Sequence, residues 1–305
     1  MSPEQKVAVD VDGITLTLSN LDKVLYPHVG FTKGEVIDYY TRIAPVLLPH
    51  IADRPTTFKR YPEGVDGQFF FAKNAPSHTP DWVRTVTLPS PGSTKNRETI
   101  NYPLVSDLPA LVWAANLAAL ELHVPMWRVT AKGKPRHPDL LVFDLDPGPP
   151  ATIVECCEVA QHVRTVLDED GLSAYPKTSG SKGLQLYVPL DESRSWEDVH
   201  GYARALAQRL EGEYPKLVVW NMKKELRKGK VLVDWSQNNA AKTTIAVYSL
   251  RARARPTVST PITWDEVESC KRADDLVFTS TDVLARVNEL GDLFAPILDG
   301  GQSLP

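Results

Sequence analysis

The stretch Leu140-Leu141-Val142-Phe143-Asp144-Leu145-Asp146, followed by Pro147-Gly148-Pro149-Pro150, decides the fold. Residues that are apolar except at Asp144 and Asp146 predict a buried strand, and the Pro-Gly-Pro-Pro run ends it. Side chains alternate between the two faces of a strand, so both carboxylates point the same way. Two such charges repel each other unless a cation lies between them. We expect the pair either to bind a divalent metal, because Mg²⁺ and Mn²⁺ prefer oxygen ligands, or to cap the following turn.

A third carboxylate lies on a second apolar run, Lys230-Val231-Leu232-Val233-Asp234-Trp235. Three acids on two buried strands can hold two metal ions roughly 3.5–4 Å apart, the arrangement for in-line phosphoryl transfer. One ion would activate an attacking hydroxyl, and the other would neutralise a triphosphate and the pyrophosphate that leaves. This prediction requires the two strands to be neighbours. The alternative is that Asp234 faces solvent on an edge strand.

The rest of the chain mixes strands and helices without regular βαβ alternation, which predicts an α+β fold with antiparallel or mixed sheets. Hairpin, turn and capping signals predict strands over residues 7–18 (a hairpin), 172–175, 184–188, 218–220, 231–235 and 244–250. The same signals predict helices over 32–44, 108–120, 152–171, 195–212, 264–270 and 282–290. We expect one primase-polymerase-like catalytic domain over residues 1–305, with a frayed end at about 299–305.

Composition excludes some classes of protein. No apolar run reaches transmembrane length, and the first residues lack the apolar core of an export signal. The three cysteines form no CxxC pair, which argues against a structural zinc site and for buried thiols in a reducing, cytoplasmic environment. The formal net charge of −4 means that only local basic clusters could steer a polyanion to one face.

A Gly- and Ser-rich segment, Ser179-Gly180-Ser181-Lys182-Gly183, joins two predicted strands. Its glycines let the backbone approach an anion, its hydroxyls donate hydrogen bonds, and Lys182 adds a positive charge. Arg251 and Arg253 share a face just beyond a predicted strand, and two forked guanidinium groups suit a triphosphate. Taken alone, the loop is typical of an exposed turn and the arginines of a solvated surface.

Aromatic and basic residues elsewhere add candidates of the same kind. Lys59 follows the strand-like residues 56–58 and could also meet phosphate. Three consecutive rings, Phe69-Phe70-Phe71, cannot all face one side of a strand, so an exposed ring could stack on a base. His123 follows the predicted helix 108–120 and is either a structural histidine or a phosphate contact.

Three strings together resemble one known family, the polymerase domain of bacterial LigD proteins within the archaeo-eukaryotic primase superfamily: LVFDLDPG (141–148), TSGSKGLQLY (178–187) and GKVLVDWSQN (229–238). Four further strings fit in the same order, namely LDKVLYP (21–27), RPTTFKRYPEGVD (54–66), LELHVP (120–125) and KTTIAVYSLRAR (242–253). The matches span roughly residues 15–290. The ligase and nuclease modules that often accompany this domain are absent from the sequence.

The resemblance implies a role for each matching position. The metal-binding and catalytic triad would be Asp144, Asp146 and Asp234. Contacts to the incoming nucleotide would come from Lys59, His123, Ser179, Lys182, Arg251 and Arg253, with Gln237 near the sugar and Phe70 and Phe71 stacking on bases. A downstream 5′-phosphate would be held by Lys23 and Lys33, the latter at a predicted helix start whose N–H groups favour anions.

The implied function is a DNA repair polymerase that fills gaps and extends ends in non-homologous end joining, with two Mn²⁺ or Mg²⁺ ions and a preference for ribonucleotides. Its implied partners are DNA ends, gapped DNA, ribo- or deoxyribonucleoside triphosphates, the end-binding protein Ku and a separate DNA ligase. We expect it in the cytoplasm, at the nucleoid, and away from membranes. Two other hypotheses are a catalytically weak module that binds 5′-phosphorylated DNA ends, and a primase that needs no primer.

Two details of the sequence bear on this resemblance. Many relatives have His where this chain has Gln185, which can donate a hydrogen bond but cannot carry a positive charge. Residues 88–101, rich in Pro, Gly, Ser and Lys, predict a surface loop that could meet DNA.

Overall fold

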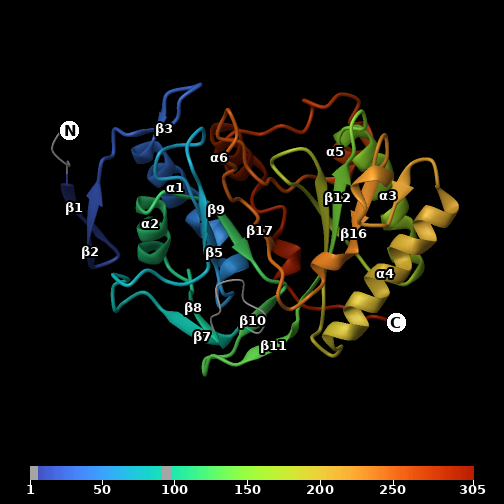
Figure 1. Ribbon diagram of the computed structural model, residues 1–305, viewed down its shortest axis with the longest axis horizontal. Coiled ribbons are helices and arrows are strands. Elements are labelled where there is room, and N and C mark those ends of the chain that lie inside the picture. The colour runs from blue at the N-terminus through green and yellow to red at the C-terminus, as the bar shows by residue number, and fades with distance from the viewer. Residues whose placement is uncertain (1–5, 91–97) are drawn as a thin grey trace.

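The computed structural model describes residues 6–90 and 98–305 and contains two larger sheets that lie side by side (Figure 1). The first has the order β17-β9-β5-β6 and is formed by β5 (Thr57–Arg60), β6 (Phe70–Ala72), β9 (Ala119–Val124) and β17 (Thr244–Ile245). The second has the order β13-β14-β12-β16-β15 and is formed by β12 (Leu140–Pro147), β13 (Tyr175–Thr178), β14 (Leu184–Pro189), β15 (Val218–Val219) and β16 (Val231–Asp234). Every pairing is antiparallel except that of β15 with β16. The predicted α+β class is confirmed.

Helices cover one side of each sheet. Two helices pack beside the first sheet, α1 (Lys33–Ile51) and α2 (Leu108–Asn116), and two cover the second, α3 (Ile153–Glu169) and α4 (Trp196–Glu213) (Figure 1). The C-terminal segment adds α5 (Trp264–Ser269) and α6 (Ser280–Leu290). Short pairs of strands complete the described chain: β1 (Lys6–Val11) with β2 (Ile14–Ser19), β3 (Val24–Tyr26) with β4 (Phe31–Thr32), β7 (Thr85–Pro89) with β8 (Thr99–Pro103), and β10 (Trp127–Val129) with β11 (Pro135–Pro138). In the described ranges, no helix combines the length and apolar character needed to cross a membrane.

Helix starts follow the capping signals in the sequence. The side chains of Thr32, Thr152 and Ser195 each accept a hydrogen bond from a backbone N–H of the first turn. The carboxylate of the acidic residue three positions later accepts a hydrogen bond from the backbone N–H of the capping residue. These reciprocal bonds satisfy donors that a helix leaves open at its start. The predicted starts of α1, α3 and α4 are therefore confirmed.

Strand alternation on β12 separates two hydrophobic cores. Leu141, Phe143 and Leu145 are fully buried in the core formed with α3 and α4. Leu140 and Val142 face the opposite way, into the core shared with the first sheet. Asp144 and Asp146 continue this second face, so they leave the strand on the side that faces the first sheet.

Several predicted boundaries were wrong. The helix predicted over 108–120 ends at Asn116, Ala118 has a positive φ of 56°, and the next six residues form β9. A run that is apolar on all sides suits a buried helix and a buried strand equally, so periodicity could not separate them. Conversely, α1 continues through Pro45 and Pro49 to Ile51, because its apolar face is buried along its whole length.

Other corrections concern the second half of the chain. The strand predicted over 172–175 is β13, which begins only at Tyr175, and the one predicted over 244–250 ends at Ile245. Within residues 299–305, where the sequence predicts a frayed end, Leu304 is buried and Gln302 forms two hydrogen bonds with Ser173. Of the predicted loop 88–101, residues 91–97 lie outside the described chain, while its two ends belong to β7 and β8.

The start of β12 is tied to the first half of the chain by a largely buried ion cluster. Arg54 is 1% exposed, and its two terminal nitrogens donate to the carboxylate of Asp139 at 2.7 and 2.6 Å. Arg128 donates to the same carboxylate at 3.0 Å. Although burial raises the pKa of Asp139, the two guanidinium groups outweigh it and hold the pKa below its usual value.

We expect Asp139→Asn to lower the free energy of unfolding by about 3–5 kcal/mol, because Arg54 would keep its buried charge without a counter-ion. The folded-state pKa of Asp139 lies below its unfolded value of about 3.9, so its contribution is complete above that pH and is lost as the pH falls through the folded value. Urea unfolding of both proteins at pH 7 and at acid pH measures this. Asp38→Asn, which breaks an exposed pair with Arg42, is the control and should leave the midpoint unchanged. An equal midpoint for Asp139→Asn would contradict the assignment.

Candidate active site

The three predicted carboxylates meet on one face of the second sheet. β12 and β16 are antiparallel neighbours, and their register places Asp144 directly opposite Asp234. Asp146 lies two residues further along β12, opposite Leu232. The prediction that these strands are adjacent is confirmed, and the alternative of an exposed Asp234 is wrong because that residue is 9% exposed.

Burial and mutual repulsion raise the pKa values of Asp144 and Asp146. Burial, followed by the charges of Asp146 and Asp234, raises the pKa of Asp144 to about 7. Burial and the charge of Asp234 also raise the pKa of Asp146, while Arg227 and Arg251 oppose that rise. The site therefore holds excess negative charge, which favours a bound cation.

A buried lysine lies behind the carboxylates. Lys177 is 0% exposed, and its ammonium group donates to Gln185 Oε1 at 2.5 Å and to Ser259 Oγ at 2.6 Å. Gln185 in turn hydrogen bonds to Asp144 and holds down its pKa. Because Lys177 occupies the amide oxygen, the amide NH₂ of Gln185 is left to donate to the carboxylate. Gln185 thus links the amine of Lys177, whose pKa is lowered by burial and raised by the charge of Asp144, to the acidic face without itself carrying charge.

The donor set fits a hard divalent cation in its chemistry, since all three groups are carboxylates. Within residues 6–90 and 98–305, however, no three His, Cys, Asp or Glu side chains already stand in metal-binding geometry. Asp234 is held by its own neighbours: Ser236 donates to Oδ1 through its N–H and its hydroxyl, and Gln237 donates to Oδ2 at 2.8 Å. The acids therefore share a face but do not form a closed cluster.

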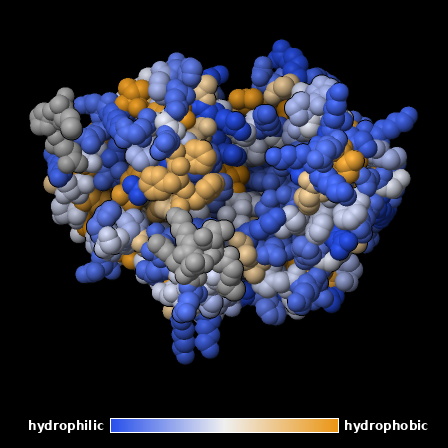
Figure 2. Space-filling model, viewed as in Figure 1, coloured by the Kyte–Doolittle hydropathy of each residue, from blue (hydrophilic) through white to orange (hydrophobic). Residues whose placement is uncertain are grey.

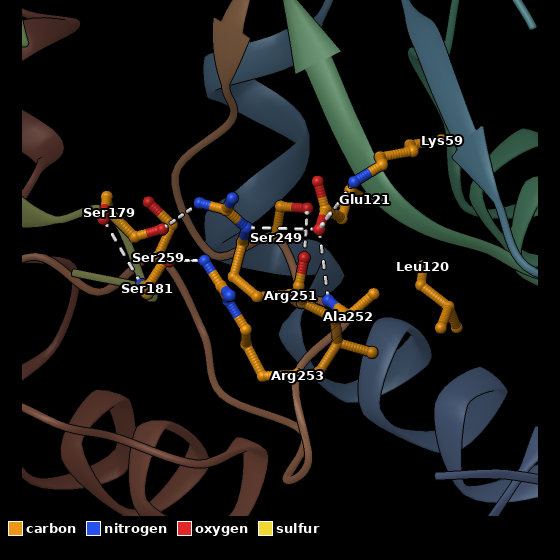
Figure 3. A network of polar contacts seen from close by, with 12 residues as sticks. Lys59, Leu120, Glu121, Ser179, Ser181, Ser249, Arg251, Ala252, Arg253 and Ser259 are labelled. Carbon is orange, nitrogen blue, oxygen red and sulfur yellow. Dashed lines mark hydrogen bonds and ion pairs between the residues drawn. The ribbon is translucent and has the colours of Figure 1, made fainter. Parts of the chain in front are cut away.

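Basic side chains gather on the first sheet beside this face (Figure 3). Glu121, on β9, lies between Lys59 of β5 and Arg251, which follows β17. His123, also on β9, contacts the same carboxylate at 3.0 Å. Burial lowers the pKa of His123, and the charges of Arg251 and Lys59 act in the same direction, while the hydrogen bond and charge of Glu121 oppose them.

Two arginines connect the basic group to the Ser179–Gly183 loop. Arg251 donates to the carbonyl oxygen of Ser179, and Arg253 donates to the hydroxyl of Ser181 (Figure 3). The loop lies tightly on β12, because a Cβ at Gly183 would approach the carbonyl oxygen of Leu145 to 2.1 Å. The predicted loop and the predicted arginine pair are thus in direct contact.

Lys182 of the same loop is placed differently. It is exposed and lines a cavity of about 390 Å³ together with Pro147, residues 149–153 and residues 276–278. None of the three aspartates lines this cavity. The cavity therefore lies beside the acid cluster, and we do not assign the chemistry to it.

Exposed aromatic rings border the basic group. Phe69, Phe70 and Phe71 are 51%, 45% and 51% exposed, and they alternate sides as predicted. The ammonium group of Lys59 lies over the rings of Phe69 and Phe71, and the guanidinium of Arg60 lies over Phe70. Figure 2 shows a hollow near the middle of this face of the molecule, with an apolar patch on the half that holds the first sheet. Such rings beside cations suit stacked, negatively charged ligands.

The sequence matches a known protein family. A family model described as LigD, primase-polymerase domain, matches residues 32–294. The multifunctional non-homologous end joining protein LigD of Mycolicibacterium smegmatis is 49% identical over 280 residues, 92% of this chain. The chain belongs to the LigD primase-polymerase family.

LigD proteins from two other bacteria are also similar to this chain in sequence or in structure. The bifunctional non-homologous end joining protein LigD of Bacillus subtilis is 31% identical over 291 residues, 95% of this chain. The polymerase domain of Mycobacterium tuberculosis Ligase D, solved in complex with DNA, aligns with a TM-score of 0.87 and 44% identity, covering 94% of this chain and 99% of that one. The chain spans less than half of its curated relatives, 36% of the M. smegmatis protein and 45% of the B. subtilis protein. The LigD polymerase domain is a metal-dependent, DNA-directed nucleotidyltransferase, and this chain is such a domain.

The two lysines expected at a 5′-phosphate are neighbours through β3 and β4. The N–H of Lys33 donates to the carbonyl of Lys23 at 2.8 Å. Lys23 is partly exposed and pairs with Glu63, whereas Lys33 is 6% exposed and its ammonium donates to Ser19. Lys33 lies at the start of α1 as predicted, and the first N–H groups of that helix bond to Lys23, Leu21 and Thr32.

Sequence reasoning missed two charged residues of this LigD-type site. Lys177 precedes the quoted TSGSKG string, and Glu121 lies inside LELHVP, but neither carries a recognisable motif. The sequence does contain one signal for such residues, namely a single charged residue within an otherwise apolar strand. A charge in that position is rarely buried without a partner, so it indicates a buried ion pair or hydrogen bond.

We expect Gln185→Leu to lower the free energy of unfolding by about 1–3 kcal/mol, because the buried ammonium of Lys177 would lose an acceptor. Chemical denaturation followed by circular dichroism measures the change. The matched control is Gln161→Leu, which removes only a bond within α3 and should have a much smaller effect. Equal effects of the two substitutions would show that the bridge does not contribute.

Proposed function

We propose that this domain extends DNA ends and fills gaps, adding nucleotides, with ribonucleotides preferred, to a primer 3′-hydroxyl in non-homologous end joining. The observation that carries the proposal is Arg251. It contacts Glu121 on the first sheet and Ser179 in the loop between β13 and β14 of the second sheet, and its charge acts on Asp146. One guanidinium therefore joins the basic group to the acidic face, as a site for a metal-bound triphosphate requires.

In this proposal Asp144, Asp146 and Asp234 hold two Mn²⁺ or Mg²⁺ ions. The ions, when bound, would activate the primer hydroxyl and neutralise the departing pyrophosphate. The protein supplies the position of the substrates. Arg251, Arg253, Lys59, His123 and Ser179 contact the phosphates, Gln237 lies near the sugar, and Phe70 and Phe71 stack on bases. For Lys182, which lines the neighbouring cavity, the proposed phosphate contact rests on the family resemblance alone.

The comparisons support the choice of partners. The M. tuberculosis domain was solved with DNA, and the relatives are named for non-homologous end joining. We therefore propose DNA ends and gapped DNA as substrates, and Ku and a DNA ligase as partners. We also propose a cytoplasmic, nucleoid-associated location.

We expect Asp144→Asn and Asp234→Asn each to lower the rate of primer extension at least about 100-fold, because the loss of a metal ligand removes several kcal/mol of charge stabilisation. The assay measures nucleotide addition to a primed template with Mn²⁺, using ribo- and deoxyribonucleotides in parallel. Asp168→Asn, on the exposed side of α3, is the control. Full activity in either site variant would remove the two-metal mechanism, and end binding with no activity in the wild type would favour the DNA-end binding module instead.

We expect Lys23→Ala to abolish most of the advantage of a 5′-phosphorylated gap over an unphosphorylated one, because Lys23 is the more exposed of the two lysines. The ratio of extension rates on the two substrates measures this and cancels effects on the chemical step. Lys132→Ala, in the turn between β10 and β11, is the control. An unchanged ratio would place the phosphate contact elsewhere.

A further inference from the structure

Glu121 is a buried acid at the centre of the basic group. It lies on β9, an inner strand of the first sheet, and is 3% exposed. Its position between Lys59 and Arg251 is visible in Figure 3. A carboxylate is costly to bury, and one placed where a triphosphate should bind would repel it. Its presence there therefore calls for a physical reason.

The contacts of Glu121 supply that reason. Oε1 accepts a hydrogen bond from the N–H of Ala252 at 3.1 Å and lies 3.4 Å from Arg251 Nε and 3.9 Å from Lys59 Nζ. Oε2 lies 3.0 Å from His123 Nε2. One carboxylate thus joins β5, β9 and the segment after β17. The Arg251 contact is an ion pair and not an aligned hydrogen bond, because its Nε has no hydrogen-bond partner.

The charge of Glu121 also offsets repulsion among its neighbours. Lys59 and Arg251 carry like charges, and both form their ion pair with this carboxylate. Burial opposes ionisation of Glu121, but the hydrogen bond from His123 and the charge of Arg251 lower its pKa to about 2. The group is therefore fully ionised at neutral pH.

We propose that Glu121 is a positioning residue for the nucleotide triphosphate, which acts by holding Arg251 toward the Ser179 loop. The carboxylate fixes the Nε side of the guanidinium and the adjacent backbone N–H of Ala252, so the terminal nitrogens extend to Ser179 and the phosphate site. This inference rests on the proposed function, because it concerns the same triphosphate site.

Without this carboxylate, the strongest attraction left for Arg251 is the acidic face. Asp146 already interacts with its charge. In Glu121→Gln the amide keeps the shape and the acceptor for Ala252, but the ion pairs are lost. Arg251 would then turn toward the aspartates and leave the phosphate position. Glu121→Gln also makes the site more positive, and if Glu121 acted only by repelling phosphate, this would strengthen triphosphate binding. Weaker binding therefore indicates positioning of Arg251, and tighter binding indicates simple charge attraction.

The experiment measures the Kd of ATP by calorimetry in the presence of Mn²⁺ and without DNA. We expect Glu121→Gln to weaken binding at least about tenfold and Glu121→Asp, which retains the charge, to recover part of the loss. Glu192→Gln, which breaks a comparable pair with Arg136 away from the site, should bind as the wild type does. Tighter or equal binding by Glu121→Gln, or no recovery in Glu121→Asp, would overturn the proposal.

A double-mutant cycle tests whether Glu121 acts through Arg251. In an Arg251→Met background, Glu121→Gln should weaken ATP binding less than about threefold further, because its partner is already absent. Fully additive losses would show a general structural effect and would contradict the proposal. Thermal unfolding of each variant shows whether the protein remains folded. If Glu121→Gln does not fold, the Kd of Glu121→Asp is compared with that of the wild type in its place.

The same measurements separate this inference from the proposed function. ATP binding by the wild type together with unchanged binding by Glu121→Gln would overturn only the role of Glu121. No ATP binding by the wild type would overturn the nucleotide site and the role of Glu121 together. In primer extension, Glu121→Gln should raise the nucleotide KM by a larger factor than it lowers kcat, in contrast to the Asp144 variant, whose loss should appear in kcat.

Discussion

The structure depends on like charges that the backbone forces together. Alternation along β12 places Asp144 and Asp146 on one face, and antiparallel pairing with β16 sets Asp234 opposite Asp144. The other face of the strand is packed into the core formed with α3 and α4, so the acids cannot turn away from each other. Burial and repulsion raise the pKa of Asp144 and Asp146, and the fold must supply positive charge close by.

Each sheet buries one ionisable group of the type opposite to its exposed charges, although burial lowers the pKa of Lys177 well below its usual value. On the second sheet, Lys177 lies behind the acids and reaches Asp144 through the amide of Gln185. On the first sheet, Glu121 lies among the bases. Arg251 connects the basic group of the first sheet with the acidic face of the second, because its charge interacts with both Glu121 and Asp146. The proposed substrate, a triphosphate with its metal ions, carries both signs of charge, and the charges on the two sheets would complement each sign.

Sequence reasoning succeeded where the determining physics is local. Capping boxes at Thr32, Thr152 and Ser195 depend on residues three apart, and the shared face of Asp144 and Asp146 depends on residues two apart. It failed where tertiary packing decides, as at the end of α2, where an apolar run becomes β9 only because it joins a sheet. Glu121 and Lys177 were missed for the same reason: their partners come from distant segments, and neither pattern nor composition brings those segments together.

The two ends of β12 show why the site can be both precise and responsive. At its start, Asp139 is held by Arg54 and Arg128 in short, largely buried contacts, which fix the second sheet to the first half of the chain. At its other end, the link between sheets is Arg251, whose terminal nitrogen bonds to a single carbonyl of the Ser179 loop. A phosphate oxygen is a stronger acceptor for a guanidinium than a carbonyl is, so an arriving triphosphate can replace that contact. In the proposed function, the permanent ion cluster keeps the strand in place while the exchangeable contact of Arg251 receives the triphosphate.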